Sequence, residues 1–297
     1  MDYIDKVICC LPEEYKRIFF DFFSSSVNRK KVTELRFRVA MPSSVTYGDR
    51  NISVFGGREI IFTEAEMLGF ISRLCEESVH TYASTINDGY ISLADGLRVG
   101  VCGKARCENG KIVSVREITS VCVRIPHSIY GVSADIFPLI LQKQMAYSAL
   151  IYSLPGVGKT TVLRDLAVRL SQKKRVAVVD SRGEIYVREM FAHSLCDFLD
   201  GYPKGLGIEL ATRTLSPEAI ICDEIGDEDT AGILSAQNTG VPLIATAHGE
   251  KFSEILMRPG IKKLHDAGVF RFYIGLNREM GCEKFTFDIK DAGRMRT

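Results

Sequence analysis

The residues with the clearest chemical pattern lie in one glycine-rich stretch, residues 151–161, which ends in Lys159-Thr160-Thr161. Backbone N–H groups at the start of a helix have no partner within the helix, so they bind phosphate oxygens well. Lys159 adds positive charge for the outer phosphates, and the Thr160 hydroxyl can hold Mg²⁺. The stretch therefore predicts a phosphate-binding loop for ATP and Mg²⁺. The predicted nucleotide-binding residues are Ser153, Leu154, Pro155, Gly156, Val157, Gly158, Lys159, Thr160 and Thr161.

One position departs from the usual G-x-x-x-x-G-K-[ST] pattern, because Ser153 stands where the first glycine is expected. Serine is a mild change there, unless the corner demands a backbone angle that serine disfavours. The alternative interpretation is a glycine-rich turn that binds nothing. An apolar strand before the loop and an amphipathic helix after it favour phosphate binding.

An acidic pair, Asp223-Glu224, follows the apolar run at residues 219–222. Asp223 is predicted to hold Mg²⁺ through water, alongside Thr160. Glu224 is predicted to orient and deprotonate the attacking water, because phosphoryl transfer depends on positioning and charge neutralisation. Alone, a strand that ends in Asp-Glu is a weak signal; downstream of a phosphate-binding loop it is a strong one.

Two other strand ends contribute candidates. Asp180 and Glu184 follow the apolar run at residues 176–179, where an open α/β sheet places its site. The alternative is an acidic loop that caps the next helix. His248 follows the run at residues 243–247 and is predicted to sense the γ-phosphate or contact the water. The alternative is an ordinary loop histidine.

Arg213 and Arg258 are candidates for neutralising transition-state charge, within one chain or across a subunit boundary. Either could equally be a surface arginine. The predicted catalytic set is thus Glu224, His248, Glu184 and Arg213, and the predicted metal ligands are Thr160 and Asp223.

The elements that position these residues indicate an α/β fold. Apolar runs without alternation, as at residues 148–152, 176–179, 219–222 and 243–247, are typical of parallel strands buried on both faces. Helical spacing from Thr160 to about Gln172 predicts the helix that follows the loop. Together they predict a RecA-like P-loop NTPase domain with a mainly parallel sheet.

The N-terminal part has a different pattern. Strict alternation at residues 33–39 predicts a half-buried strand, residues 64–77 have helical periodicity, and Asn109-Gly110 predicts a hairpin. These features indicate a smaller α+β domain over residues 1–135, followed by the ATPase domain over residues 136–297. Residues 126–138 are interpreted as the linker, and residues 136–147 as a helix that leads into the first strand.

Composition limits the class of protein. The 297 residues are 46% hydrophobic with a net charge of +1, so bulk charge does not point to a nucleic-acid partner. Nine scattered cysteines without a C-x-x-C pair fit a reducing compartment and make zinc an unlikely ligand. There is no signal-peptide pattern and no uninterrupted apolar run of about 20 residues, so we expect a cytoplasmic protein without a membrane span.

The order of these motifs resembles the secretion-type ATPases of type II and type IV secretion and pilus machines, and within them the stage III sporulation protein AA family. The resemblance extends from residue 33 to about residue 276 and is strongest from 150 to 250. It rests on residues 33–42, 87–100, 108–111, 123–125, 178–185, 216–217, 222–226 and 245–249. Two positions differ from the family pattern, Ser153 in place of Gly and Gly183 in place of Ser.

The resemblance implies a homo-hexameric ATPase in the mother cell of an endospore former, at the base of the channel to the forespore. It implies membrane proteins of that channel as partners, and a peripheral location at the membrane. It also implies that the N-terminal domain helps to close the nucleotide site, with Arg98 and Arg124 as candidates. Two other functions remain open: a nucleotide-binding assembly module with little turnover, and a nucleic-acid motor on the same fold.

Overall fold

The computed structural model describes residues 2–24, 29–48, 50–76, 78–93, 96–278 and 284–295. The chain forms two compact units, Met1–His127 and Ser128–Thr297, which are described separately below. Among the described residues, no helix is both long and apolar enough to cross a membrane.

The N-terminal unit is built on an antiparallel sheet with strand order β3-β2-β1-β8-β7-β6. Its strands are β1 (Val32–Arg38), β2 (Ser44–Tyr47), β3 (Arg50–Ile52), β6 (Tyr90–Ser92), β7 (Arg98–Glu108) and β8 (Lys111–Arg124). A small separate hairpin joins β4 (Val54–Phe55) and β5 (Arg58–Glu59). The alternation predicted for the first strand is present, since Leu35 and Phe37 are buried and Arg36 between them is not.

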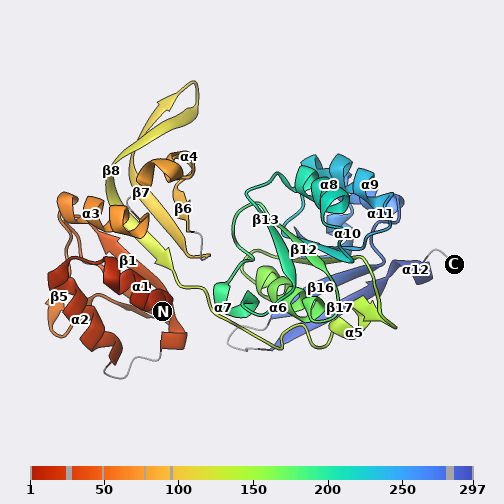
Figure 1. Cartoon of the computed structure of the whole chain (residues 1–297), viewed down its shortest axis with the longest axis horizontal. Helices are drawn as coiled ribbons and strands as arrows, with labels where there is room; N and C mark the ends of the chain where they lie inside the picture. Colours follow the sequence, from red (N-terminus) through yellow and green to blue (C-terminus); the bar gives the residue numbers. More distant parts are fainter. Residues whose placement is uncertain are drawn as a thin grey trace. The chain divides into compact units, whose positions relative to one another are not determined.

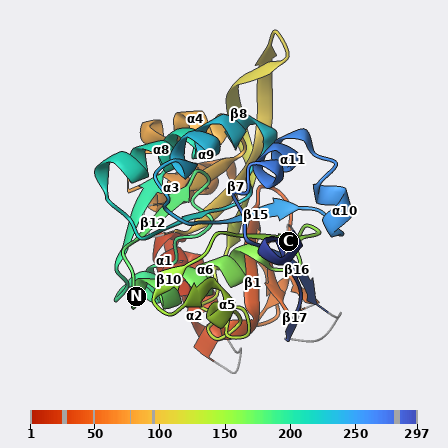
Figure 2. The same ribbon diagram turned by 90° about the vertical axis from the view of Figure 1, so that its right-hand side faces the viewer.

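Helices cover the apolar side of this sheet. They are α1 (Tyr3–Cys10), α2 (Glu13–Ser24), α3 (Glu64–Leu74) and α4 (Ala83–Asn87), with short 3-10 turns at Arg29–Lys31 and Val79–Tyr82. Phe37 packs against Phe19, Phe62 and Phe70 in an aromatic core. Strands β7 and β8 continue beyond the sheet as a two-stranded ribbon (Figures 1 and 2). The predicted turn is at its tip, where Asn109 and Gly110 both have positive φ.

The segment before the second sheet differs from prediction. Residues 136–147 were expected to form one helix, but they form α5 (Phe137–Ile140) and a hairpin of β9 (Leu141–Gln142) and β10 (Met145–Ala146). The unit boundary also lies earlier than the predicted residue 135. The reason is Asp165, whose carboxylate accepts hydrogen bonds from the backbone of Gly131 and Ser133 and attaches this segment to the second unit.

The C-terminal unit contains a seven-stranded sheet with order β13-β12-β14-β15-β11-β16-β17, parallel except for β17. Its strands are β11 (Ala149–Ser153), β12 (Val176–Asp180), β13 (Cys196–Asp200), β14 (Ala219–Cys222), β15 (Leu243–His248), β16 (Phe272–Arg278) and β17 (Phe285–Asp291). Strands β11, β12 and β14 are buried along their whole length, as their continuous apolar runs predicted. This confirms an α/β fold with a mainly parallel sheet.

Helices cover both faces of this sheet. The helices of the unit beyond α5 are α6 (Lys159–Ser171), α7 (Arg188–Phe191), α8 (Lys204–Thr214), α9 (Thr230–Gln237), α10 (Phe252–Ile255), α11 (Pro259–Asp266) and α12 (Ala292–Met295), with a 3-10 turn at Asp227–Asp229. Helices α8, α9 and α11 lie on one side and α6 on the other (Figure 1). The parallel register places Ser153 opposite His248 and Val179 opposite Cys222. The carboxyl ends of β11, β12, β14 and β15 therefore meet at one edge.

Candidate active site

The glycine-rich loop joins the end of β11 to the start of α6. Gly156 and Gly158 have φ of 78° and 124°, backbone angles that favour glycine. A Cβ at Gly158 would also come within 2.8 Å of the Phe285 ring. Ser153, in contrast, is an extended strand residue paired with His248, so serine is accommodated without backbone strain at this corner.

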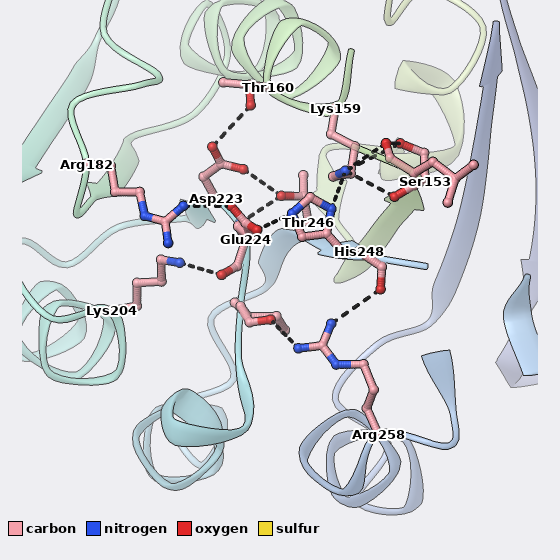
Figure 3. Close-up of polar contacts among 12 residues, drawn as sticks. Ser153, Lys159, Thr160, Arg182, Lys204, Asp223, Glu224, Thr246, His248 and Arg258 are labelled. Carbon is pink, nitrogen blue, oxygen red and sulfur yellow. Dashed lines mark hydrogen bonds and ion pairs between the residues drawn. The ribbon is translucent and has the colours of Figure 1, made fainter. Parts of the chain in front are cut away.

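Lys159 points back into this loop. Its Nζ donates to the carbonyl oxygens of Ser153 at 3.1 Å and Leu154 at 3.2 Å, and lies 3.0 Å from His248 Nδ1 (Figure 3). The side chain is buried, and this burial lowers the pKa of Lys159 from its ordinary value; the nearby carboxylates of Glu224 and Asp223 act in the opposite direction. The loop therefore holds a buried cation at the start of a helix, where phosphate oxygens are favoured.

Three oxygen-bearing side chains meet beside the loop. Thr160 Oγ1 donates to Asp223 Oδ2 at 3.2 Å, and Thr246 Oγ1 donates to Asp223 Oδ1 at 2.6 Å. Mg²⁺ takes oxygen ligands and often only one or two from the protein, with phosphates and water as the rest. The adjacent oxygens of Thr160 and Asp223 fit that chemistry.

Glu224 and His248 lie in direct contact. Glu224 Oε1 accepts from His248 Nε2, and its Oε2 accepts from Arg182 Nη1 at 3.1 Å. The Glu224 backbone has φ of 44°, unusual for a residue other than glycine. Its N–H donates to Thr246 Oγ1 at 2.8 Å, and its carbonyl accepts from Lys204 Nζ. These contacts fix both the backbone and the carboxylate of Glu224 (Figure 3).

Asp180 and the backbone of Glu184 belong to one loop. The Asp180 carboxylate accepts the backbone N–H groups of Glu184, Ile185 and Tyr186 at 2.8–3.1 Å, so it shapes the loop after β12. Burial raises the pKa of Asp180, and the three N–H groups oppose that shift. The contacts of the Glu184 backbone with Asp180 and Arg164 belong to the same loop. The carboxylate that is seen to touch His248 is that of Glu224.

The two candidate arginines have different surroundings. Arg258 donates to the carbonyls of His248 at 3.3 Å and Ile225 at 3.4 Å, so it supports the backbones of both site loops. Arg213 is exposed and pairs with Glu209 in the last turn of α8. It lies nine residues beyond Lys204, roughly 13 Å along the helix. The structure does not bring Arg213 to the site of its own chain, and a role across a subunit boundary stays a prediction.

Sequence reasoning missed three residues of this cluster, which are Arg182, Lys204 and Thr246. Thr246 contributes its hydroxyl. Thr246 lies in β15 two residues before His248, so both side chains are on the same face of the strand. This period-of-two spacing was a usable signal. The partners of Arg182 and Lys204 depend on the order of the strands, which the sequence does not state.

Comparisons with known proteins bear on the family and the fold. Residues 5–292 match the family described as "Sporulation stage III, protein AA". The chain belongs to this family. It is 36% identical over 223 residues to the Bacillus subtilis (strain 168) protein named Stage III sporulation protein AA, covering 71% of this chain and 72% of that one. It is also 33% identical over 132 residues to the Arabidopsis thaliana protein SEEDLING PLASTID DEVELOPMENT 1, covering 39% of this chain and 18% of that protein.

Two solved structures have a fold similar to that of this member of the sporulation stage III protein AA family. The ATPase DotB of Legionella pneumophila superposes with a TM-score of 0.66 at 15% identity, over 95% of this chain and 81% of that chain. The DotB ATPase of Yersinia pseudotuberculosis gives a TM-score of 0.58 at 15% identity, over 94% and 79%. The predicted RecA-like fold is thus confirmed.

The N-terminal unit of this family member has a cationic pocket of its own. Arg98 and Arg124 are directly opposite each other in the β7–β8 ladder, and Arg36 lies one strand further along. The three line a pocket of about 360 Å³ together with Tyr90 and Cys122. Glu34 is directly opposite Arg124 and pairs with Arg36 at 2.8 Å, so one carboxylate of the sheet balances part of this positive charge.

Proposed function

We propose that this chain is a secretion-type ATPase that binds ATP with Mg²⁺ and hydrolyses it, and that it powers or regulates the channel between mother cell and forespore during endospore formation. The observation that supports hydrolysis is the convergence of Lys159, Thr160, Asp223, Glu224 and His248 at one sheet edge. Family membership supports the role in sporulation.

In the proposed reaction, a water oxygen attacks the γ-phosphorus and its proton passes to Glu224. The bond between that phosphorus and the bridging oxygen breaks, and ADP and phosphate leave. Lys159 holds the outer phosphates by charge, and His248 lies beside the carboxylate of Glu224, which its Nε2 contacts in the structure. Thr160 and Asp223 would hold Mg²⁺, which neutralises phosphate charge when bound.

We further propose that the chain acts as a homo-hexamer, in which Arg98 and Arg124 face a nucleotide bound by a neighbouring copy. The arginine pocket of the N-terminal unit supports this role, because Arg98, Arg124 and Arg36 line it together. The proposed partners are membrane proteins of the sporulation channel, and the proposed location is the cytoplasmic face of that channel in the mother cell.

A second candidate is a nucleotide-binding assembly module with little turnover. The inward contacts of Lys159 with two loop carbonyls favour it, because a nucleotide must first displace them. The two functions are separated by measuring ATP binding and hydrolysis over a range of protein concentrations, with Lys159→Ala as the control. An ATPase gives Lys159-dependent turnover that rises with concentration. Lys159-dependent binding without turnover would support the module and contradict the ATPase.

A further inference from the structure

The Glu224 carboxylate is occupied by protein donors at both of its oxygens. His248 Nε2 contacts Oε1, and Arg182 Nη1 contacts Oε2 at 3.1 Å. A general base must instead hold the attacking water at hydrogen-bond distance. In the arrangement of Figure 3, therefore, two protein donors hold Glu224 and compete with water for its carboxylate.

His248 connects this carboxylate to the nucleotide loop. Lysine has only donors, so His248 Nδ1 must accept from Lys159 Nζ at 3.0 Å, and the ring proton is then on Nε2, toward Glu224. Lys159, His248, Glu224 and Arg182 thus form one continuous chain of contacts. A phosphate that draws Lys159 away removes the group that fixes the His248 ring.

Two neighbouring members of this chain of contacts, Arg182 and Glu224, are suited to movement. Arg182 has a side chain that is 57% exposed, and it precedes Gly183, which has φ of 63°. Glu224 holds the unusual φ of 44° only with the help of Thr246 and Lys204. Residues held in sparsely populated backbone regions cluster at sites that switch between arrangements.

We propose that Arg182 is a positioning residue that holds Glu224 in a resting arrangement, and that a bound triphosphate releases this carboxylate by withdrawing Lys159 from His248. The inference rests on the proposed function, since it requires a nucleotide at the loop. Part of the binding free energy of ATP is then used to separate Arg182 from Glu224. Arg182 itself makes no required contact with the phosphates.

Nucleotide affinity tests this proposal without any measurement of turnover. The probe is the Mg²⁺ complex of a non-hydrolysable ATP analogue, titrated into the full chain by calorimetry. The variants are Arg182→Ala, Glu224→Ala and the double variant. An ion pair with this exposure contributes little, so we expect Arg182→Ala to lower Kd about two- to fivefold. In the Glu224→Ala background the same change should leave Kd unaltered, because the contact is already absent.

Arg175→Ala is the matched control. Arg175 is also exposed and ion-paired, with Glu218, but it lies at the opposite end of β12 from Arg182. It should leave Kd unchanged. A rise in Kd for Arg182→Ala would mean that the guanidinium binds phosphate, and an equal fall in both backgrounds would mean that Glu224 is not its partner. Either result overturns this inference alone. If the unmodified chain does not bind the analogue, or binds it no better than Lys159→Ala does, the proposed function is overturned as well.

Discussion

Replacing Thr246 with valine removes one hydroxyl from the centre of the site and changes little else. Thr246 is fully buried, and its Oγ1 bridges the two acidic residues by donating to Asp223 Oδ1 at 2.6 Å and accepting from the Glu224 N–H at 2.8 Å. Valine has nearly the same shape, so it leaves no new cavity. It does leave a buried carboxylate oxygen and a backbone N–H without this partner.

The loss of folding stability in Thr246→Val follows from those two unpaired groups. A hydrogen bond to a charged group contributes about 1.5–3 kcal/mol, and an unpaired buried N–H costs about 1–3 kcal/mol. Thr246→Val should therefore lower the free energy of unfolding by about 3–5 kcal/mol. Thr246→Ser keeps the hydroxyl and loses only a methyl group, which costs about 1 kcal/mol.

Urea unfolding followed by circular dichroism measures this difference, since the chain has no tryptophan to report it. The same variants should separate in ATP hydrolysis, with Thr246→Val inactive and Thr246→Ser active. The reasoning is refuted if valine unfolds within about 1 kcal/mol of the unmodified chain. It is also refuted if serine is as damaging as valine.

Three further predictions concern the loop and its supports. Gly158→Ala should weaken Mg²⁺-ATP binding more than Gly156→Ala does. A Cβ at Gly158 would meet an aromatic ring at 2.8 Å, whereas a Cβ at Gly156 would have no atom within 4 Å. Calorimetry gives both Kd values. Asp165→Ala should lower the unfolding free energy by about 3–5 kcal/mol, because four donors, the last being Arg169 Nε, lose a buried carboxylate. The exposed Asp135→Ala should change it little in the same urea titration. Because burial lowers the pKa of Lys159, the ammonium should lose its proton below the ordinary lysine value of about 10.4. Mg²⁺-ATP affinity should then fall as pH rises through this lowered pKa, and an affinity that stays constant up to the ordinary value would contradict the shift.

The sequence was sufficient to predict four of the parallel strands and the residues at their ends, but not β13. Continuous apolar runs located β11, β12, β14 and β15, and carboxyl ends of parallel strands share an edge, so Lys159 and Asp223-Glu224 were expected to meet. The contact of Arg182 with Glu224 depends on β12 pairing with β14. Strand order comes from packing between distant segments, and local patterns do not state it.

The hairpin after α5 was missed for a local reason. Its two turn residues, Lys143 and Gln144, both have positive φ, at 45° and 69°. Two-residue hairpins of this kind usually use Asn or Gly, which tolerate such angles. Lys and Gln favour helix instead, so the propensity of this stretch indicated the wrong structure. Pairing of Gln142 with Met145 and the packing around it outweighed that preference.

ATP hydrolysis by Glu224→Gln beside Glu184→Gln tests the central claim most directly. The proposed site predicts that Glu224→Gln still binds Mg²⁺-ATP but loses turnover, because the amide cannot take the proton of the attacking water. Glu184→Gln should keep turnover, since the contact with His248 is made by Glu224. Normal hydrolysis by Glu224→Gln together with loss in Glu184→Gln would contradict this assignment and make Glu184 the base.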